Sequence, residues 1–469
     1  MTSNAHPPPG SGRLHERSAL QLAELLRAGE VSSRELTSHF LDRIDRHGGQ
    51  VNAFVRLFER RARREAAAAD RASKAGEEQG TFAGVPIAVK DTDPVQRSRF
   101  HVGSRVLKYA WSPTDSPATR RIRAGGFVIT GKTVTSELAL MPIVETDLGP
   151  PCRNPWDWQR TPGGSSGGAA AAVAGGLLPI AHATDGGGSI RIPASHCGLF
   201  GIKVSRGLLE NFYGSRDPNG TAGVNAVTHT VEDSAAMLDV MAGTKYDPRT
   251  PPADSMLARS REEPPRLKIR FTTESHVTDV EPHIAEGVEQ VAHALEGLGH
   301  DVSPSPIADL PVEDILPIFG RMAAGLPAVV ERWLQPSTIW LRRYGLQFSD
   351  AEITDRIAMV RREIDRWFGD TDVWLTPTVP QRPSRVGYWH ELDGEETFRS
   401  AIPYGAFTTV FNISGHPAAN VPAGLSPDGL PFGAQIVGRR GSDATLLALA
   451  RQLEQVRPWA HLRSPMMAT

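Results

Sequence analysis

The sequence has few of the features that mark secreted, membrane-spanning or nucleic-acid-binding proteins. Its 469 residues include only two cysteines, Cys152 and Cys197, which cannot form a disulfide framework and fit a reducing compartment. No run approaches the roughly 18–20 apolar residues of a membrane span, and residues 1–13 lack the apolar segment of a signal peptide. The formal net charge of −2 indicates no polyanionic partner. We therefore expect a cytoplasmic protein that binds neither nucleic acid nor a membrane.

Metal and nucleotide sites also lack usable signatures. The 15 histidines form no His-Glu-x-x-His motif and the cysteines are not closely paired, so we expect no metal and no cofactor. Residues 126–133 match the phosphate-loop pattern, in which the residues between the glycines form an open loop. Here residues 127–130 have the composition of a strand instead. Residues 163–167 match the nucleophile elbow of α/β-hydrolases, but no apolar strand precedes them. Neither match predicts a site.

Alternating strand and helix patterns predict an α/β protein built on one mixed sheet. A capping box at 32–35 precedes an amphipathic helix. Further helices are expected at 53–75, 118–124, 282–298 and 445–455, and strands at 85–90, 127–130, 267–272 and 372–376. Residues 1–15 are expected to form a disordered tail, and the Pro-rich stretches 247–265 and 377–386 to be long surface connections.

The most unusual segment runs from Gly163 to Gly188 and contains nine glycines, with Ser165 near its start and Ser189 directly after its end. Glycine weakens helices and strands, so such density indicates backbone that turns tightly and leaves its N–H groups open to a ligand. A flexible linker is disfavoured because Ala169 to Ala174 is a helix-forming, apolar stretch.

Lys90 completes a plausible catalytic set with these serines. A serine hydroxyl needs a base within hydrogen-bonding reach to act as a nucleophile. A lysine can be that base when burial lowers its pKa, and Lys90 ends an apolar strand. Three glycines before Ser189 allow N–H groups to converge on an oxyanion. Cys197 is the alternative nucleophile, but its apolar surroundings favour a buried structural thiol.

These segments resemble the fingerprint of the amidase signature family, from Ser18 to Pro465. The resemblance is carried by Gly-Gly-Ser-Ser-Gly-Gly at 163–168 and Gly-Gly-Gly-Ser-Ile-Arg-Ile-Pro at 186–193, with further matches at 372–378, 412–417 and 429–435. It implies one domain, residues 16–469, with a central mixed sheet wrapped by helices.

The resemblance also implies roles for individual residues. Lys90 is the base, Ser165 is a proton shuttle that follows a cis peptide bond, and Ser189 attacks the carbonyl. The implied oxyanion donors are the N–H groups of Gly186, Gly187, Gly188 and Ser189. The implied supporting residues are Thr184, Ser166 and a braced pair, Asp185 and Arg191.

The substrate implied is a small-molecule amide, but the sequence does not identify it. The triple glycine also occurs in bacterial hydrolases of cyclic and linear oligoamides. We expect the pocket to be shaped by segments that differ from the family's pattern, namely 140–143, 211–225 and 312–350. Met141, Pro142 and Ile143 are expected to line it. Six aromatic residues are further candidates: Trp333, Trp340, Tyr344, Tyr388, Trp389 and Tyr404.

Three other functions stay open. The chain could be an amide-forming acyltransferase, because an amine can capture the same acyl-enzyme. It could be a subunit of a glutamine-dependent amidotransferase, against which the near-neutral charge and the divergent middle region argue. A non-catalytic binding protein would not need the lysine and both serines. A homodimer is also left open.

Overall fold

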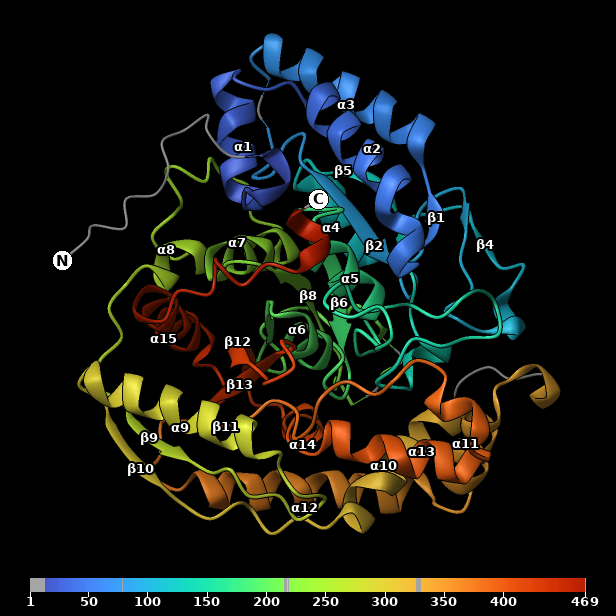
Figure 1. Ribbon diagram of the computed structural model, residues 1–469, viewed down its shortest axis with the longest axis vertical. Helices are drawn as coiled ribbons and strands as arrows, with labels where there is room; N and C mark the ends of the chain where they lie inside the picture. The colour runs from blue at the N-terminus through green and yellow to red at the C-terminus, as the bar shows by residue number, and fades with distance from the viewer. Residues whose placement is uncertain (1–12, 78, 215–216, 218, 326–329, 469) are drawn as a thin grey trace.

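The computed structural model describes residues 13–77, 79–214, 217, 219–325 and 330–468. A mixed sheet of eleven strands runs through this part of the chain in the order β1-β5-β2-β6-β8-β7-β12-β13-β11-β9-β10, and β3 and β4 form a separate pair (Figure 1). The strands are β1 Phe54–Leu57, β2 Pro86–Lys90, β3 Ser98–Arg99, β4 Trp111–Ser112, β5 Val128–Thr133, β6 Ile180–Asp185, β7 Phe200–Lys203, β8 Gly223–Thr228, β9 Lys268–Phe271, β10 Asp301–Pro304, β11 Val373–Pro377, β12 Ala418–Leu425 and β13 Pro431–Gly438.

Helices surround this sheet, as expected. Those of the described residues are α1 Ala19–Ala28, α2 Ser33–Val51, α3 Glu59–Lys74, α4 Pro117–Ala124, α5 Gly167–Ala174, α6 Arg191–Cys197, α7 Val231–Ala242, α8 Met256–Ser260, α9 Pro282–Gly297, α10 Val312–Ala324, α11 Pro336–Gly345, α12 Asp350–Phe368, α13 Gly394–Ala401, α14 Thr409–Ser414 and α15 Asp443–Val456. None of them is long and apolar enough to cross a membrane.

The predicted capping box begins α2. Ser32 accepts a hydrogen bond from the backbone N–H of Glu35, and the Glu35 side chain accepts one from the N–H of Ser32. Leu36, Phe40 and Ile44 follow at helical spacing and are all buried. They pack into an apolar core between the N-terminal helices and β2, so the amphipathic pattern read from the sequence fixes how α2 faces the sheet.

Strand β2 brings Lys90 to the middle of the molecule. It pairs in parallel with both β5 and β6, and every residue from Pro86 to Lys90 is buried. Strands covered on both faces are continuously apolar, which explains the Pro-Ile-Ala-Val run that precedes the lysine. Lys90 is the last residue of β2, so its side chain stands at the sheet end from which the loop to β3 departs.

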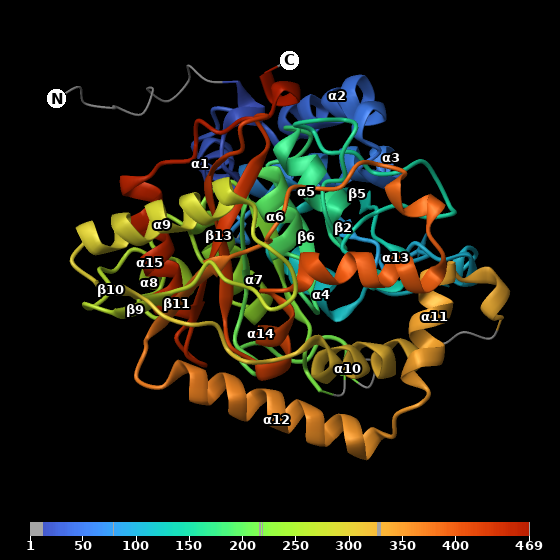
Figure 2. The same ribbon diagram turned by 60° about the horizontal axis from the view of Figure 1, so that its bottom comes forward.

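The C-terminal half forms a second apolar core and an outer layer. Helices α9 and α15 pack on β12 and β13. Helices α10, α11, α12 and α13 contact one another instead, and they form a layer along the lower side of the molecule in Figures 1 and 2. This layer closes one side of the cavity described below.

Two sequence predictions about this architecture are wrong in part. Residues 53–75 are not one helix, because Phe54–Leu57 forms β1 at the sheet edge. Strand β1 pairs antiparallel with β5 and so satisfies backbone groups of β5 that would otherwise lack a partner strand. The stretch 377–386 is not a surface connection, since 377–380 is fully buried and continues β11. The stretch 247–265 does lie largely at the surface, although it contains the short helix α8.

The predicted tail spans residues 1–15, of which 1–12 lie outside the described residues. Leu14–Glu16 forms a short 3₁₀ helix and His15 is buried. Leu14 and His15, which were expected in the tail, therefore belong to the folded part of the chain.

Candidate active site

Lys90 lies in a fully buried polar site at the end of β2. Its Nζ lies 2.7 Å from Ser165 Oγ, 2.8 Å from Ser166 Oγ and 2.9 Å from Thr184 Oγ1. The lysine side chain has no exposure to solvent. Three hydroxyls therefore surround the amine, and the structure brings together the predicted base, the predicted shuttle and two of the predicted supporting residues.

The surroundings of Lys90 favour its neutral form. Burial lowers the pKa of Lys90 from 10.5 to about 7, and the more distant carboxylates Asp185 and Asp93 oppose this shift only in part. Among the described residues, no carboxylate forms an ion pair with the Lys90 ammonium, and hydroxyls stabilise the charge less than a carboxylate would. Near neutral pH the amine can therefore hold a lone pair toward Ser165.

Ser165 and Ser166 are positioned by the glycines around them. The peptide bond between Gly164 and Ser165 is cis, as the family resemblance implies, and α5 begins immediately after Ser166. Ser166 Oγ donates to the carbonyl oxygen of Thr184, 3.1 Å away, which joins the start of α5 to the end of β6. A Cβ on Gly164 would overlap the backbone of residues 141–143, so this glycine allows the serine loop to pack on that segment.

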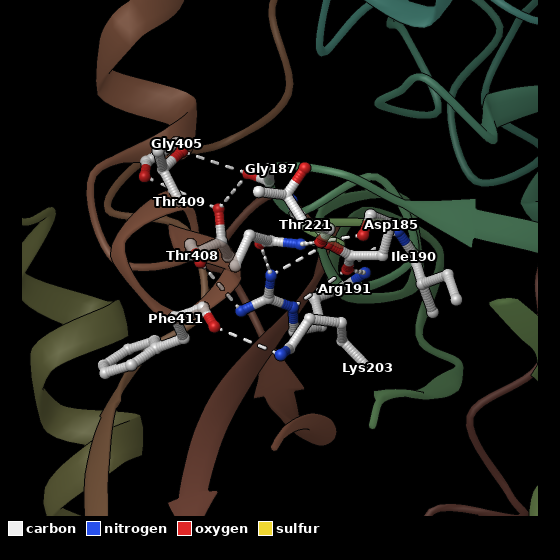
Figure 3. Close-up of polar contacts among 12 residues, drawn as sticks. Asp185, Gly187, Ile190, Arg191, Lys203, Thr221, Gly405, Thr408, Thr409 and Phe411 are labelled. Atoms are coloured by element: carbon white, nitrogen blue, oxygen red, sulfur yellow. Dashed lines mark hydrogen bonds and ion pairs between the residues drawn. The ribbon is translucent and has the colours of Figure 1, made fainter. Parts of the chain in front are cut away.

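A buried ion pair supports the loop that carries Ser189. Asp185 ends β6 and Arg191 begins α6, and two of their side-chain hydrogen bonds measure 2.9 Å each. Both side chains are fully buried. Figure 3 shows Arg191 beside Asp185. Arg191 also donates to Gln435 Oε1 at 2.7 Å and to Asn412 Oδ1 at 2.5 Å. The predicted brace is therefore present, and it extends into the C-terminal half of the chain.

The charge of Asp185 is held by these contacts. Burial by itself raises the pKa of a carboxyl group, but the charge and hydrogen bonds of Arg191 outweigh burial and hold the pKa of Asp185 well below its usual range. Asn412 Nδ2 donates to the same carboxylate at 3.0 Å. The loop between β6 and α6 is thus anchored by a permanent ion pair.

Gly188 differs from the expectation for an oxyanion donor. Its N–H donates to Asp185 Oδ1 at 2.7 Å, so this donor is already engaged. Its φ of 122° requires glycine. Within the described residues, the N–H groups of Gly186, Gly187 and Ser189 meet no acceptor. These three donors are therefore the ones available to a ligand.

Two threonines hold the same loop from the other side. Thr408 Oγ1 donates to the carbonyl oxygen of Gly187 at 2.8 Å, and Thr409 Oγ1 donates to the same oxygen at 3.1 Å (Figure 3). Both threonines lie at the start of α14, more than 200 residues later in the chain. They fix the orientation of the peptide that links Gly187 to Gly188. No sequence signal pointed to them.

A large cavity opens in front of the loop. It has a volume of about 490 Å³ and is lined by Gly164, Ser165, Thr184, Gly186, Gly187 and Ser189, among others. Ser189 is partly exposed to it, whereas Lys90 is not among the lining residues. Ser189 therefore faces the space where a ligand would bind, and Ser165 lies between that space and the lysine.

The pocket predictions hold in part. Met141 and Pro142 line the cavity, as do parts of 211–225 and 312–350, but Ile143 is packed in an apolar cluster and is not among the lining residues. None of the six aromatic candidates lines the cavity. Trp333 and Tyr388 are exposed, and the other four, Trp340, Tyr344, Trp389 and Tyr404, belong to or pack on the same cluster as Ile143. The aromatic lining consists instead of Phe100, Tyr213, Phe319, Trp367, Phe398, Phe407 and Phe411.

Other reactive groups are poor candidates. Cys197 is buried in α6, and burial raises its thiol pKa well above the usual value, so a thiolate is disfavoured. Within the described part of the chain, no three His, Cys, Asp or Glu side chains are grouped as metal ligands would be. The lysine and the two serines therefore remain the best candidates for the reactive groups of this site.

The fold, together with this set of a buried lysine, two serines and free loop N–H groups, indicates a hydrolase. Residues 35–447 match the family model described as "Amidase". AmiB2 of Mycobacterium tuberculosis is 36% identical over 458 residues, covering 94% of this chain and 96% of that protein. The chain belongs to the amidase signature family, whose members act on small-molecule amides.

Solved structures agree with this assignment. A structure of 6-aminohexanoate cyclic dimer hydrolase superposes with a TM-score of 0.86 at 30% identity, covering 97% of this chain and 100% of that one. A bacterial aryl acylamidase of the same family superposes with a TM-score of 0.86 at 26% identity, covering 97% and 99%. The predicted α/β class and family fold are confirmed.

Proposed function

We propose that this enzyme hydrolyses a carboxylic amide through an acyl-enzyme on Ser189, with Ser165 as proton shuttle and Lys90 as base. The observation that carries the proposal is the 2.7 Å contact between Lys90 Nζ and Ser165 Oγ, two atoms whose side chains are both buried. A base in direct contact with one serine, and a second serine facing the cavity, provide the relay that a neutral hydroxyl nucleophile needs.

In the proposed reaction, protons pass between Ser189 and Lys90 through Ser165. Neutral Lys90 accepts the proton of Ser165 Oγ, Ser165 accepts the proton of Ser189, and Ser189 Oγ bonds to the amide carbon. As the C–N bond breaks, the leaving nitrogen takes a proton from Ser165, which recovers one from Lys90. Water then attacks the ester by the same relay, and Ser189 regains its proton when the carboxylic acid leaves.

The oxyanion that forms during attack needs donors in place beforehand. We assign this role to the N–H groups of Gly186, Gly187 and Ser189, because the N–H of Gly188 is engaged by Asp185. The ion pair of Asp185 with Arg191 and the two threonine hydrogen bonds to Gly187 hold these donors before substrate arrives. Preorganisation of this kind avoids a reorganisation cost during the reaction.

The names of relatives suggest the first substrates to test. One structural relative is a hydrolase of the cyclic dimer of 6-aminohexanoate and another is an aryl acylamidase. The purified chain should be given a panel of aryl, alkyl and cyclic amides and matched esters, with products identified by mass spectrometry. Hydrolysis by the chain alone would exclude the amidotransferase alternative, and adding amines would reveal acyl transfer. Assembly as a homodimer remains a prediction.

We expect kcat/KM to rise with pH through an ionisation near pH 7. Protonated Lys90 cannot accept a proton, so activity should be low below its pKa of about 7 and level above it. The measurement is kcat/KM from pH 5.5 to 10 for the wild type and Lys90→Ala. Lys203→Met is the matched control, because burial also lowers the pKa of Lys203 to about 7. Among the described residues, the hydrogen-bond partner of its Nζ is the carbonyl oxygen of Phe411 and not a serine. The assignment of Lys90 as base would be contradicted if the rise in kcat/KM near pH 7 persisted in Lys90→Ala, or if it were lost in Lys203→Met.

The two threonines should matter for turnover more than for binding. Replacing both Thr408 and Thr409 by Val keeps their shape but removes both hydrogen bonds to Gly187, so the donor loop can shift. A small misplacement of catalytic groups can cost about 10²-fold, and we expect a fall in kcat of that order with little change in KM. The double Ser variant retains the hydroxyls and should retain most of the rate. Equal activity of the Val and Ser variants would show that these bonds do not position the loop.

A further inference from the structure

The cavity in front of Ser189 is largely apolar. Among its described lining residues, Asp217 and His276 are the only acidic side chain and the only histidine, and none is Lys or Arg. The Asp217 carboxylate is already satisfied, because it accepts hydrogen bonds from Thr221 N, Thr221 Oγ1 and Ala222 N at 3.0, 3.0 and 2.7 Å. His276 is exposed, outside the buried part of the cavity. A charged group inside the cavity would lose its hydration without gaining a partner.

One face of α10 builds much of the apolar surface. Ile315, Phe319 and Met322 recur at helical spacing and all line the cavity. Together with Trp367 of α12 and Phe411 of α14 they form one surface, which we call the α10 wall; all five belong to, or pack on, one apolar cluster. The wall comes closest to the nucleophile loop at Phe319, whose ring would lie 2.7 Å from a Cβ placed on Gly187.

The geometry of attack decides which part of a substrate meets this wall. The leaving nitrogen must face Ser165, which follows Gly164, and Gly164 is packed against the backbone of residues 141–143. The oxyanion must point at the loop N–H groups. The remaining substituent of the tetrahedral carbon is the acyl chain, which is directed away from Ser165. The α10 wall meets the loop at Gly187, whereas Ser165 follows a glycine that packs on residues 141–143. We therefore place the acyl chain on the α10 wall.

From these observations we infer that the preferred substrate carries a long, uncharged, apolar acyl group that packs on the α10 wall, and that Phe319 sets its accepted length. This inference rests on the proposed acyl-enzyme mechanism. Each CH₂ group buried from water favours binding by about threefold to fourfold. The acyl group should therefore dominate selectivity, and the amine should contribute less.

The test is a series of p-nitroanilides with acetyl, butanoyl, hexanoyl, octanoyl and decanoyl groups, assayed with the purified wild-type chain. We expect kcat/KM to rise about tenfold for each two added carbons until the cavity is filled. A glutaryl anilide, which ends in a carboxylate, should be cleaved at least about 100-fold more slowly than the hexanoyl anilide, because the charge has no partner. A flat or falling length profile, or preference for glutaryl, would overturn the inference.

Variants of α10 wall residues test whether this wall sets the preferred length of the acyl chain. Phe319→Trp narrows the cavity and should move the optimum to a shorter acyl chain, and Met322→Trp is a second variant with the same expectation. Ile357→Ala is the matched control: Ile357 is buried in the same cluster but does not line the cavity. It should lower thermal stability and leave the optimum unchanged. If the preferred acyl-chain length were unchanged in both Trp variants, neither Phe319 nor the α10 wall would recognise the acyl group.

A failure of the proposed function itself would look different. If no anilide is cleaved, the proposed amide hydrolysis is in doubt, but the acyl preference can still be read from the rate at which alkyl fluorophosphonates label Ser189. Faster labelling by octyl than by ethyl fluorophosphonate would support the apolar wall independently of amide turnover. Equal labelling rates would overturn the inference about the wall.

Discussion

Ser189→Ala should abolish hydrolysis of every amide and ester that the wild-type enzyme cleaves. The acyl-enzyme cannot form without this hydroxyl, and Ser165 is committed to its contact with Lys90. Loss of a nucleophile in a serine hydrolase costs about 10⁵-fold or more. The measurement is kcat/KM on the best anilide, together with fluorophosphonate treatment and peptide mass mapping of the wild type.

The adduct should lie on Ser189 and be absent from the Ala variant. Cys197→Ala is the matched control, because Cys197 is the other nucleophilic side chain weighed above and lies in the helix that follows the loop. This variant should keep its activity and its labelling. An adduct on Ser165 or Ser166, or loss of labelling in Cys197→Ala, would contradict the assignment.

Lys90→Ala should lose far more activity on amides than on esters with good leaving groups. An amine must be protonated before the C–N bond breaks, whereas a p-nitrophenolate leaves without a proton. General acid–base assistance is worth about 10²–10⁴-fold. We expect a loss in this range on an alkyl amide or anilide and a much smaller loss on the p-nitrophenyl ester of the same acid, and Ser165→Ala should behave in the same way.

The comparison needs acyl-matched substrates at saturating concentration, so that acyl binding cancels. Lys203→Met again serves as the control, since it removes a buried lysine that does not touch either serine; any loss it causes should be equal on amide and ester. Equal fractional losses for Lys90→Ala would mean that protonation of the leaving group does not pass through this lysine, and the relay would have to be abandoned.

Local patterns were enough to predict several elements of the fold. The apolar run that ends at Lys90 indicated a buried strand, and β2 is fully buried with Lys90 at its end. The capping box before residue 36 located the start of α2. The segment 53–75 shows the limit: its alanine and arginine content favours a helix, but Phe54–Leu57 lies beside β5 and completes the sheet edge. Pairing with a distant strand outweighed local preference there.

The sequence by itself was enough to propose the catalytic set of this protein. Lys90, Ser165 and Ser189 lie in short motifs whose glycines and apolar runs carry their own local geometry, so the set could be read without coordinates. Tertiary structure decided how the set is held and what it faces. Thr408 and Thr409 act on Gly187 across more than 200 residues, and Asp185 uses the Gly188 N–H. The cavity is lined by side chains such as Phe319 and Trp367 instead of the six aromatic candidates. The physical reason is that hydrogen bonds and apolar contacts between distant segments depend on how helices and strands pack, and one sequence read locally carries no record of that packing.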